Sequence, residues 1–184
     1  GARETVALLN EYFTDMVDVV SRYGGILDKY IGDAIMALFG APFKKIDDAD
    51  HALCVANEML MALAVLNRRR RARGEAPIDI GVGIATGDVI AGNIGSPTRM
   101  EYTVIGDSVN LASRLEGANK AYGSKILFSE FTYARLANPI LTRDIDLIKV
   151  KGKDFPVGVH ESLDYRAAEL DRGLGAMLEN YAKG

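Results

Sequence analysis

Residues 24–40, which read GGILDKYIGDAIMALFG, constrain the fold more than any other stretch of this sequence. Two short apolar runs, 26–31 and 34–39, are joined by Gly32 and Asp33. A Gly-Asp pair between apolar runs indicates a β-hairpin, because glycine takes the positive φ of a tight turn. We therefore predict a hairpin with the Asp33 carboxylate at its tip. Such a carboxylate can bind a cation, or a phosphate with its metal, or it is polar merely because turns are polar.

Composition limits the classes of function. The chain has 184 residues, is 48% hydrophobic and carries a net charge of −3, so we expect one domain with no affinity for nucleic acid. The single cysteine, Cys54, excludes an internal disulfide and is expected to be a small core residue on a helix. Two distant histidines make a histidine-based metal site unexpected. With no apolar run of transmembrane length and no secretory pattern, we expect a cytoplasmic protein, or a cytoplasmic domain, without direct membrane contact.

Apolar periodicity predicts a helix on each side of the hairpin. The first covers residues 4–23, with an apolar face of Val6, Leu9, Phe13, Met16, Val17 and Val20. The second begins after Asp47 and Asp48, with a buried stripe of Leu53, Ala56, Met59, Leu60, Leu63 and Leu66. Five arginines end it: Arg68, Arg69, Arg70, Arg71 and Arg73. They could hold a phosphate or an acidic partner, but cations are favourable at a helix C-terminus, which favours a solvated helix end.

The middle of the chain predicts strands. Large residues from Ile78 to Ile84 alternate with small ones, including Gly81 and Gly83. This GxG lacks the strand-turn-helix context of a dinucleotide fingerprint, so we expect the small face to let another backbone, or a base, lie close. A turn at 86–88 leads into a second strand at 89–94. After a loop at 95–97, another short run covers 102–105.

A third helix is predicted to open at residues 106–108. It carries Asn110 and Arg114, which are four residues apart and so share one helical face. An amide and a guanidinium in the first turns could clamp an anion or a transition state. A surface pair on an amphipathic helix is the alternative, and the spacing alone favours it.

The remaining segments complete the fold class. They are a strand at 125–129, a short helix at 131–136, a strand at 145–150 followed by Lys151, and its hairpin partner at 157–163. An amphipathic helix is expected at 165–182, which divides the chain into a domain of residues 1–164 and a C-terminal helix of residues 165–184. Helices separated by single strands and hairpins favour an α+β fold with one sheet and helices on its face.

Four segments together resemble the catalytic domain of class III nucleotide cyclases, the adenylyl and guanylyl cyclases. They are GGILDKYIGDAIMALFG, GVGIATGDVIAGNIG, YTVIGDSVNLASRLE and VKGK, and the resemblance runs from residue 7 to 163. It implies a ferredoxin-like sheet with helices packed on one face. It also implies an adenylyl cyclase that converts ATP to 3′,5′-cyclic AMP and pyrophosphate, as the ribose 3′-hydroxyl attacks the α-phosphorus with the help of two Mg²⁺ or Mn²⁺ ions.

The same resemblance assigns roles to residues. Asp33 matches the second of two metal-binding carboxylates. Lys29 matches the purine-selecting position, where an ammonium donates to adenine N1, and Thr103 matches its partner, whose hydroxyl accepts from the adenine amino group. Asn110 and Arg114 match a pair that orients the ribose and stabilises charge on the α-phosphoryl group.

Further implications concern the outer phosphates and the partners. Lys151 matches a lysine that contacts the outer phosphates, with Arg99 as a helper. Threonine at position 103 resembles a bacterial subgroup that includes bicarbonate-responsive enzymes, so a response to bicarbonate is implied as an option. In the family, the metal carboxylates and base-selecting residues of one site come from different subunits. A head-to-tail homodimer with shared sites is therefore implied, with regulatory domains elsewhere in the full-length protein.

One departure from the family pattern leaves alternatives open. The family's first metal-binding Asp lies on a strand before the first helix, in a segment like FxDIxxFT, which the printed sequence does not include. We expect that strand to belong to the molecule, because the later site positions are intact. A non-catalytic cyclase-homology module that dimerises and transmits a signal is the main alternative. A diguanylate cyclase is disfavoured because Ile26 and Leu27, not acidic residues, follow Gly25, and a guanylyl cyclase is disfavoured by Lys29.

Overall fold

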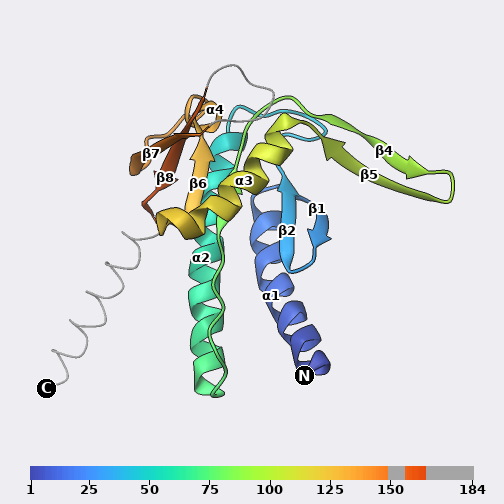
Figure 1. Ribbon diagram of the computed structural model, residues 1–184, viewed down its shortest axis with the longest axis vertical. Coiled ribbons are helices and arrows are strands. Elements are labelled where there is room, and N and C mark those ends of the chain that lie inside the picture. Colours follow the sequence, from blue (N-terminus) through green and yellow to red (C-terminus); the bar gives the residue numbers. More distant parts are fainter. Residues whose placement is uncertain (149–155, 165–184) are drawn as a thin grey trace, which may run out of the picture.

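The computed structural model describes residues 1–148 and 156–164. Figure 1 shows helices and strands in a mixed arrangement, so the predicted α+β class is confirmed. The described elements are, in chain order, α1 (Ala2–Arg22), β1 (Ile26–Ile31), β2 (Ala34–Leu38), α2 (Asp48–Ala72), β3 (Val82–Ile84), β4 (Ile90–Ser96), β5 (Arg99–Ile105), α3 (Asp107–Tyr122), β6 (Ile126–Ser129), α4 (Glu130–Tyr133), β7 (Thr142–Ile148) and β8 (Val157–Ser162).

In the described part of the chain, the strands form three hydrogen-bonded groups rather than the one sheet we expected. A four-stranded sheet has the order β3-β6-β8-β7, and β1-β2 and β4-β5 are separate hairpins. β3 pairs in parallel with β6 and is the edge strand of this sheet, whereas β4, its neighbour in sequence, pairs with β5. The β4-β5 ladder continues to the pair of Ser96 and Arg99, so the connection expected at 95–97 is instead the two residues 97 and 98. The β7-β8 hairpin is confirmed.

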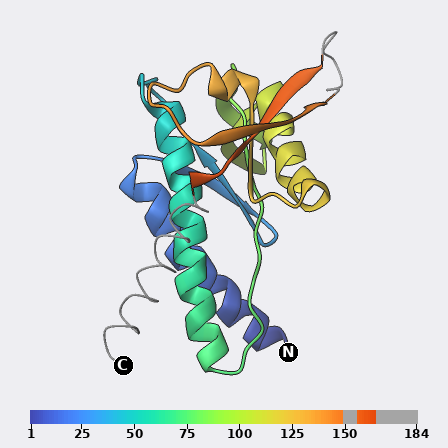
Figure 2. The ribbon, with the colours of Figure 1, turned by 90° about the vertical axis from the view of Figure 1, so that its left-hand side faces the viewer.

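One core lies between α1 and α2, which run side by side in both views (Figures 1 and 2). It includes Met16 and Val20 from α1 and Met59, Leu63 and Leu66 from α2. The predicted stripe of α2 is therefore largely confirmed, with Leu60 only partly buried. On α1 the buried face is rotated from the predicted one. Tyr12 and Val19 are buried, whereas Val6 is 57% exposed.

One expectation about α2 was wrong. Cys54 is exposed, because it lies to one side of the buried stripe rather than in it. By length and composition alone α2 is also apolar enough to cross a membrane, with a mean hydropathy of 1.4 over its best window. We interpret α2 as the core helix of this domain, since its stripe packs against α1.

The small face of β3 receives the backbone of α3. A Cβ atom placed on Gly83 would lie 2.1 Å from the carbonyl oxygen of Ala112 and 2.3 Å from the backbone nitrogen of Glu116. Farther along the helix, the Asn119 amide donates to the Val82 carbonyl over 3.0 Å. Of the two options left open by the sequence, close approach of another backbone is the correct one. This packing fixes the position of α3.

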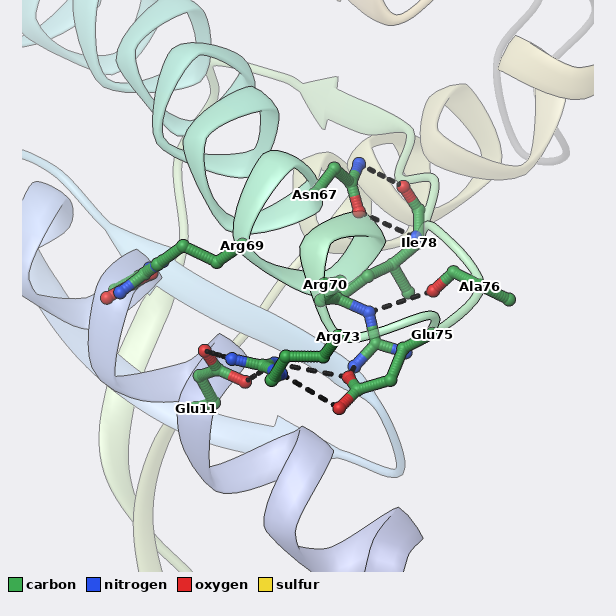
Figure 3. A network of polar contacts seen from close by, with 9 residues as sticks. Glu11, Asn67, Arg69, Arg70, Arg73, Glu75, Ala76 and Ile78 are labelled. Carbon is green, nitrogen blue, oxygen red and sulfur yellow. Dashed lines mark hydrogen bonds and ion pairs between the residues drawn. The ribbon is translucent and has the colours of Figure 1, made fainter.

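The arginine-rich end of α2 is not simply solvated. The chain reverses at Gly74, where φ is +75°, and residues 75 and 76 fold back over the helix (Figure 3). Arg70 is only 8% exposed, and its guanidinium donates to the Ala76 carbonyl and to the Glu75 carboxylate, each over 2.9 Å. Arg73 reaches Glu75 and Glu11. The solvated-end prediction was therefore wrong for Arg70, because the reversal covers its side chain.

Candidate active site

The β1-β2 hairpin presents Asp33 to solvent. The two strands pair up to Ile31 and Ala34, which leaves Gly32 and Asp33 as the turn. Gly32 has a φ of +65°, the left-handed conformation for which glycine has no steric cost. The hairpin prediction is confirmed, and the Asp33 side chain is exposed at its tip.

The two expected purine-selecting residues lie together, although they belong to different hairpins. Thr103 is buried on β5, and its hydroxyl donates to Oδ2 of Asp28 on β1 over 2.8 Å. The ammonium of Lys29 lies 3.6 Å from the same oxygen. Lys29 and Thr103 therefore share one carboxylate. The sequence pattern assigns no role to Asp28, because only this contact between the two hairpins reveals it.

Arg99 and Glu101 extend this charged group along β5. The Arg99 guanidinium donates to Glu101 over 2.8 Å, and the Lys29 ammonium lies 3.8 Å from the same carboxylate group. The hydrogen bond from Arg99 lowers the pKa of Glu101, with the charges of Arg99 and Lys29 adding to the effect. Arg99 is 83% exposed, so its guanidinium is accessible from solvent.

α3 carries Asn110 and Arg114 on its exposed side. Leu111 and Leu115 are 2% and 0% exposed and anchor the opposite face of the helix in the core. Among the residues that the structure describes, neither the Asn110 amide nor the Arg114 guanidinium makes a side-chain hydrogen bond or an ion pair. A fixed helix thus holds an amide and a guanidinium that are free to contact a ligand.

Asp33 is the one residue of this sequence that the resemblance implies as a ligand of divalent ions. Asp33 offers the carboxylate oxygen that Mg²⁺ and Mn²⁺ favour. Within residues 1–148 and 156–164, however, no group of three or more His, Cys, Asp or Glu residues could hold a metal ion. These residues do not by themselves form a two-metal site. Lys151 and the expected helix at 165–182 lie outside the described residues.

A family model provides the comparison that decides the class. The model of the adenylate and guanylate cyclase catalytic domain matches residues 1–163. This chain belongs to that family. The cyclase domain spans between 8% and 32% of the length of the first four curated relatives that it matches. It is 42% identical over 167 residues to an adenylate cyclase of Anabaena cylindrica, which covers 86% of the chain and 32% of that protein. It is 35% identical over 158 residues to adenylate cyclase 1 of Rhizobium meliloti, and this match covers 86% of the chain and 24% of that protein.

Solved structures support the same fold. The adenylyl cyclase CyaB from P. aeruginosa is similar with a TM-score of 0.80 and 39% identity, over 88% of this cyclase domain and 83% of that chain. The guanylyl cyclase Cya2 is similar with a TM-score of 0.76 and 36% identity, over 88% of this cyclase domain and 81% of that chain. Both adenylyl and guanylyl cyclases resemble this domain. Overall similarity therefore does not distinguish adenine from guanine as the preferred base, and individual side chains must do so.

Proposed function

We propose that this domain is an adenylyl cyclase that converts ATP to 3′,5′-cyclic AMP and pyrophosphate. The observation that carries the proposal is the cluster of Lys29 and Thr103 around one buried carboxylate. An ammonium can donate to adenine N1, whereas guanine carries a hydrogen at N1 and would be repelled. A threonine oxygen can accept from the 6-amino group of adenine. The relatives named adenylate cyclases support the same choice.

The reaction joins two parts of one nucleotide. The ribose 3′-hydroxyl oxygen forms a bond to the α-phosphorus and loses its proton to water or to the leaving pyrophosphate. The bond from that phosphorus to the bridging oxygen breaks, and pyrophosphate leaves. The Arg114 guanidinium is proposed to stabilise the charge that develops on the α-phosphoryl oxygens, and the Asn110 amide to orient the ribose. Their lack of partners among the described side chains supports these roles. Lys151 is proposed to contact the outer phosphates, with Arg99 as a helper.

Divalent cations and a second subunit complete the proposal. Two Mg²⁺ or Mn²⁺ ions, one of them bound by Asp33, would neutralise phosphate charge. The β4-β5 hairpin extends away from the body and exposes Ile90, Met100 and Tyr102 by 71%, 56% and 67% (Figure 1). This apolar surface supports a head-to-tail homodimer with shared sites. A cytoplasmic location, where ATP is available, attached regulatory domains and a response to bicarbonate are further parts of the proposal.

Product formation tests the function. The purified protein is incubated with ATP or GTP and with Mn²⁺ or Mg²⁺, over a range of protein concentrations. Cyclic AMP from ATP, with specific activity that rises with protein concentration, is expected. Lys29→Glu should lower the kcat/KM for ATP by about 10²-fold or more, since a carboxylate faces adenine N1 without a proton between them. Unchanged ATP turnover by this variant would refute the role of Lys29.

A non-catalytic signalling module is the second candidate. It is favoured by one observation, that within the described part of the chain no group of three or more His, Cys, Asp or Glu residues could hold a metal ion. If a folded dimer forms no cyclic nucleotide from ATP or GTP with either metal, this second function is the better one.

A further inference from the structure

Asp28 is the buried acidic group on which the proposed base-binding side chains converge. Its side chain is only 3% exposed, although it belongs to a two-stranded hairpin near the surface. Its Oδ2 atom accepts the hydroxyl hydrogen of Thr103 and lies 3.6 Å from the Lys29 ammonium. Burying a carboxylate is costly unless hydrogen bonds and an opposite charge compensate, and both are present here.

The local backbone explains how Asp28 reaches this position. Tyr30 stacks on Phe13 of α1 with 4.1 Å between ring centroids, so Lys29 points to the other side of β1. In a regular strand, Asp28 would point to the same side as Tyr30, toward α1. A β-bulge between Leu27 and Lys29 breaks the alternation. Bulges re-aim side chains, and this one lets two consecutive residues both reach toward β5.

We propose that Asp28 is a positioning residue that sets the purine preference of the site by fixing the direction of the Thr103 hydroxyl. This inference rests on the adenylyl cyclase function proposed above. A threonine hydroxyl has one hydrogen to donate and two lone pairs that accept. A carboxylate only accepts, so the hydrogen of Thr103 is committed to Asp28. The Thr103 oxygen can therefore offer only lone pairs to a base.

That restriction distinguishes purines. Adenine carries a 6-amino group, which donates to a lone pair. Guanine and hypoxanthine carry a 6-oxo group, whose lone pairs would face those of Thr103 with no hydrogen between them. The same carboxylate, together with Glu101 at 3.8 Å, holds the ammonium of Lys29 beside Thr103. Asp28 thus orients the Lys29 ammonium as a donor to N1 of adenine and the Thr103 oxygen as an acceptor from its 6-amino group.

The variant Asp28→Asn tests the proposal. Its amide can donate to Thr103, which frees the hydroxyl to turn and donate to a 6-oxo group. ATP and ITP are the probes, because their bases differ in the 6-substituent and in the hydrogen at N1. The ratio of kcat/KM for ATP to that for ITP should fall by about 10- to 100-fold, the range for a buried acceptor that gains the hydrogen-bond donor it lacked. Asp146→Asn on β7 makes the same chemical change in a carboxylate that accepts the hydroxyl hydrogen of Tyr122 on α3, and it should leave the ratio unchanged.

A second background shows whether Asp28 acts through Thr103. In the variant Thr103→Val, which has no hydroxyl, the further change Asp28→Asn should alter the ATP-to-ITP ratio far less than it does in the wild-type background, because only the contact with Lys29 is left to change. Thr103→Ser keeps the hydroxyl and should retain the sensitivity to Asp28→Asn. A ratio that stays at the wild-type value in Asp28→Asn, or equal losses for ATP and ITP, would overturn the proposal and leave Asp28 a structural residue.

Binding of non-cyclising nucleotides separates this inference from the cyclase function. 3′-Deoxy-ATP and 3′-deoxy-ITP lack the attacking hydroxyl, and their dissociation constants are measured by calorimetry on the full chain. If wild-type protein forms no cyclic product but prefers 3′-deoxy-ATP, and Asp28→Asn abolishes that preference, the inference holds and the cyclase function fails. If wild-type protein has no preference between the two analogues, the inference is refuted. Cyclic AMP formation with an unaltered ratio in the variant refutes the inference alone.

Discussion

Adding one methyl group at Gly83 should separate α3 from β3, whereas the same change at Gly117 should stabilise the domain. A Cβ atom at Gly83 would lie 2.1 Å from a backbone oxygen and 2.3 Å from a backbone nitrogen of α3. Ordinary contacts there begin at 3.4 Å, so the helix would have to move by about 1 Å or more. Gly117 lies within α3, and an added Cβ has nothing within 4 Å.

The expected magnitudes have opposite signs. Overpacking costs about 1–3 kcal/mol, and we expect Gly83→Ala at or above the upper end, because backbone atoms of an anchored helix cannot rotate away. For a chain of this size, the melting temperature should fall by about 6–12 °C. Gly117→Ala should add about 0.5–1 kcal/mol through helix propensity.

Urea unfolding followed by far-ultraviolet circular dichroism measures both changes as shifts of the midpoint at constant m-value. Because α3 carries Arg114, Gly83→Ala should also lower cyclase turnover by about 10²-fold, measured well below its melting temperature. If Gly83→Ala unfolds at the wild-type midpoint, or if Gly117→Ala loses as much stability, the close packing of α3 on β3 is refuted.

Three further predictions concern single side chains. Arg114→Ala should lower kcat by about 10²–10³ in steady-state assays and leave the melting temperature unchanged; equal turnover would exclude a role in the transition state. Arg70→Met should cost about 1–3 kcal/mol in urea unfolding, because the Ala76 carbonyl loses a charged donor, whereas the exposed Arg68→Met should stay within about 0.5 kcal/mol. Burial, followed by the charges of Asp33 and Glu116, raises the pKa of Tyr12 to about 12. The unfolded chain then releases this proton first, near pH 10, so the free energy of unfolding should fall as the pH rises from about 10 to 12. Tyr12→Phe should remove that part of the pH dependence, and an identical profile in both proteins would contradict the shift.

Most of the local structure could be predicted from the sequence. The turn at Gly32 and the end of α1 before Gly24 follow from glycine chemistry, and the stripe of α2 follows from the helical period. The failures are equally local. Val6 fits the periodic pattern of α1, yet no element among the described residues buries it. Cys54 has the small apolar side chain that is typical of core residues, but it lies on the helix to one side of the buried stripe.

Some residues of the candidate site could be identified from the sequence, and one could be found only in the structure. Lys29, Asp33, Thr103, Asn110 and Arg114 were identified from their matches to a family pattern, and the structure places Lys29 beside Thr103. Asp28 could not be assigned in this way. Its role depends on a bulge that no residue type announces, and on a contact with a residue 75 positions away in sequence.

The sequence by itself determined which segments are helices and hairpins, because periodicity and turn chemistry act over a few neighbouring residues. Only the tertiary structure decided which strands pair. β3 pairs with β6 rather than with β4, and α3 rather than a base lies on Gly83. It also decided that Arg70 is buried under a chain reversal and that Asp28 joins Lys29 to Thr103. These outcomes depend on the free energy of contacts between distant segments, and such contacts leave no periodic signal in the chain.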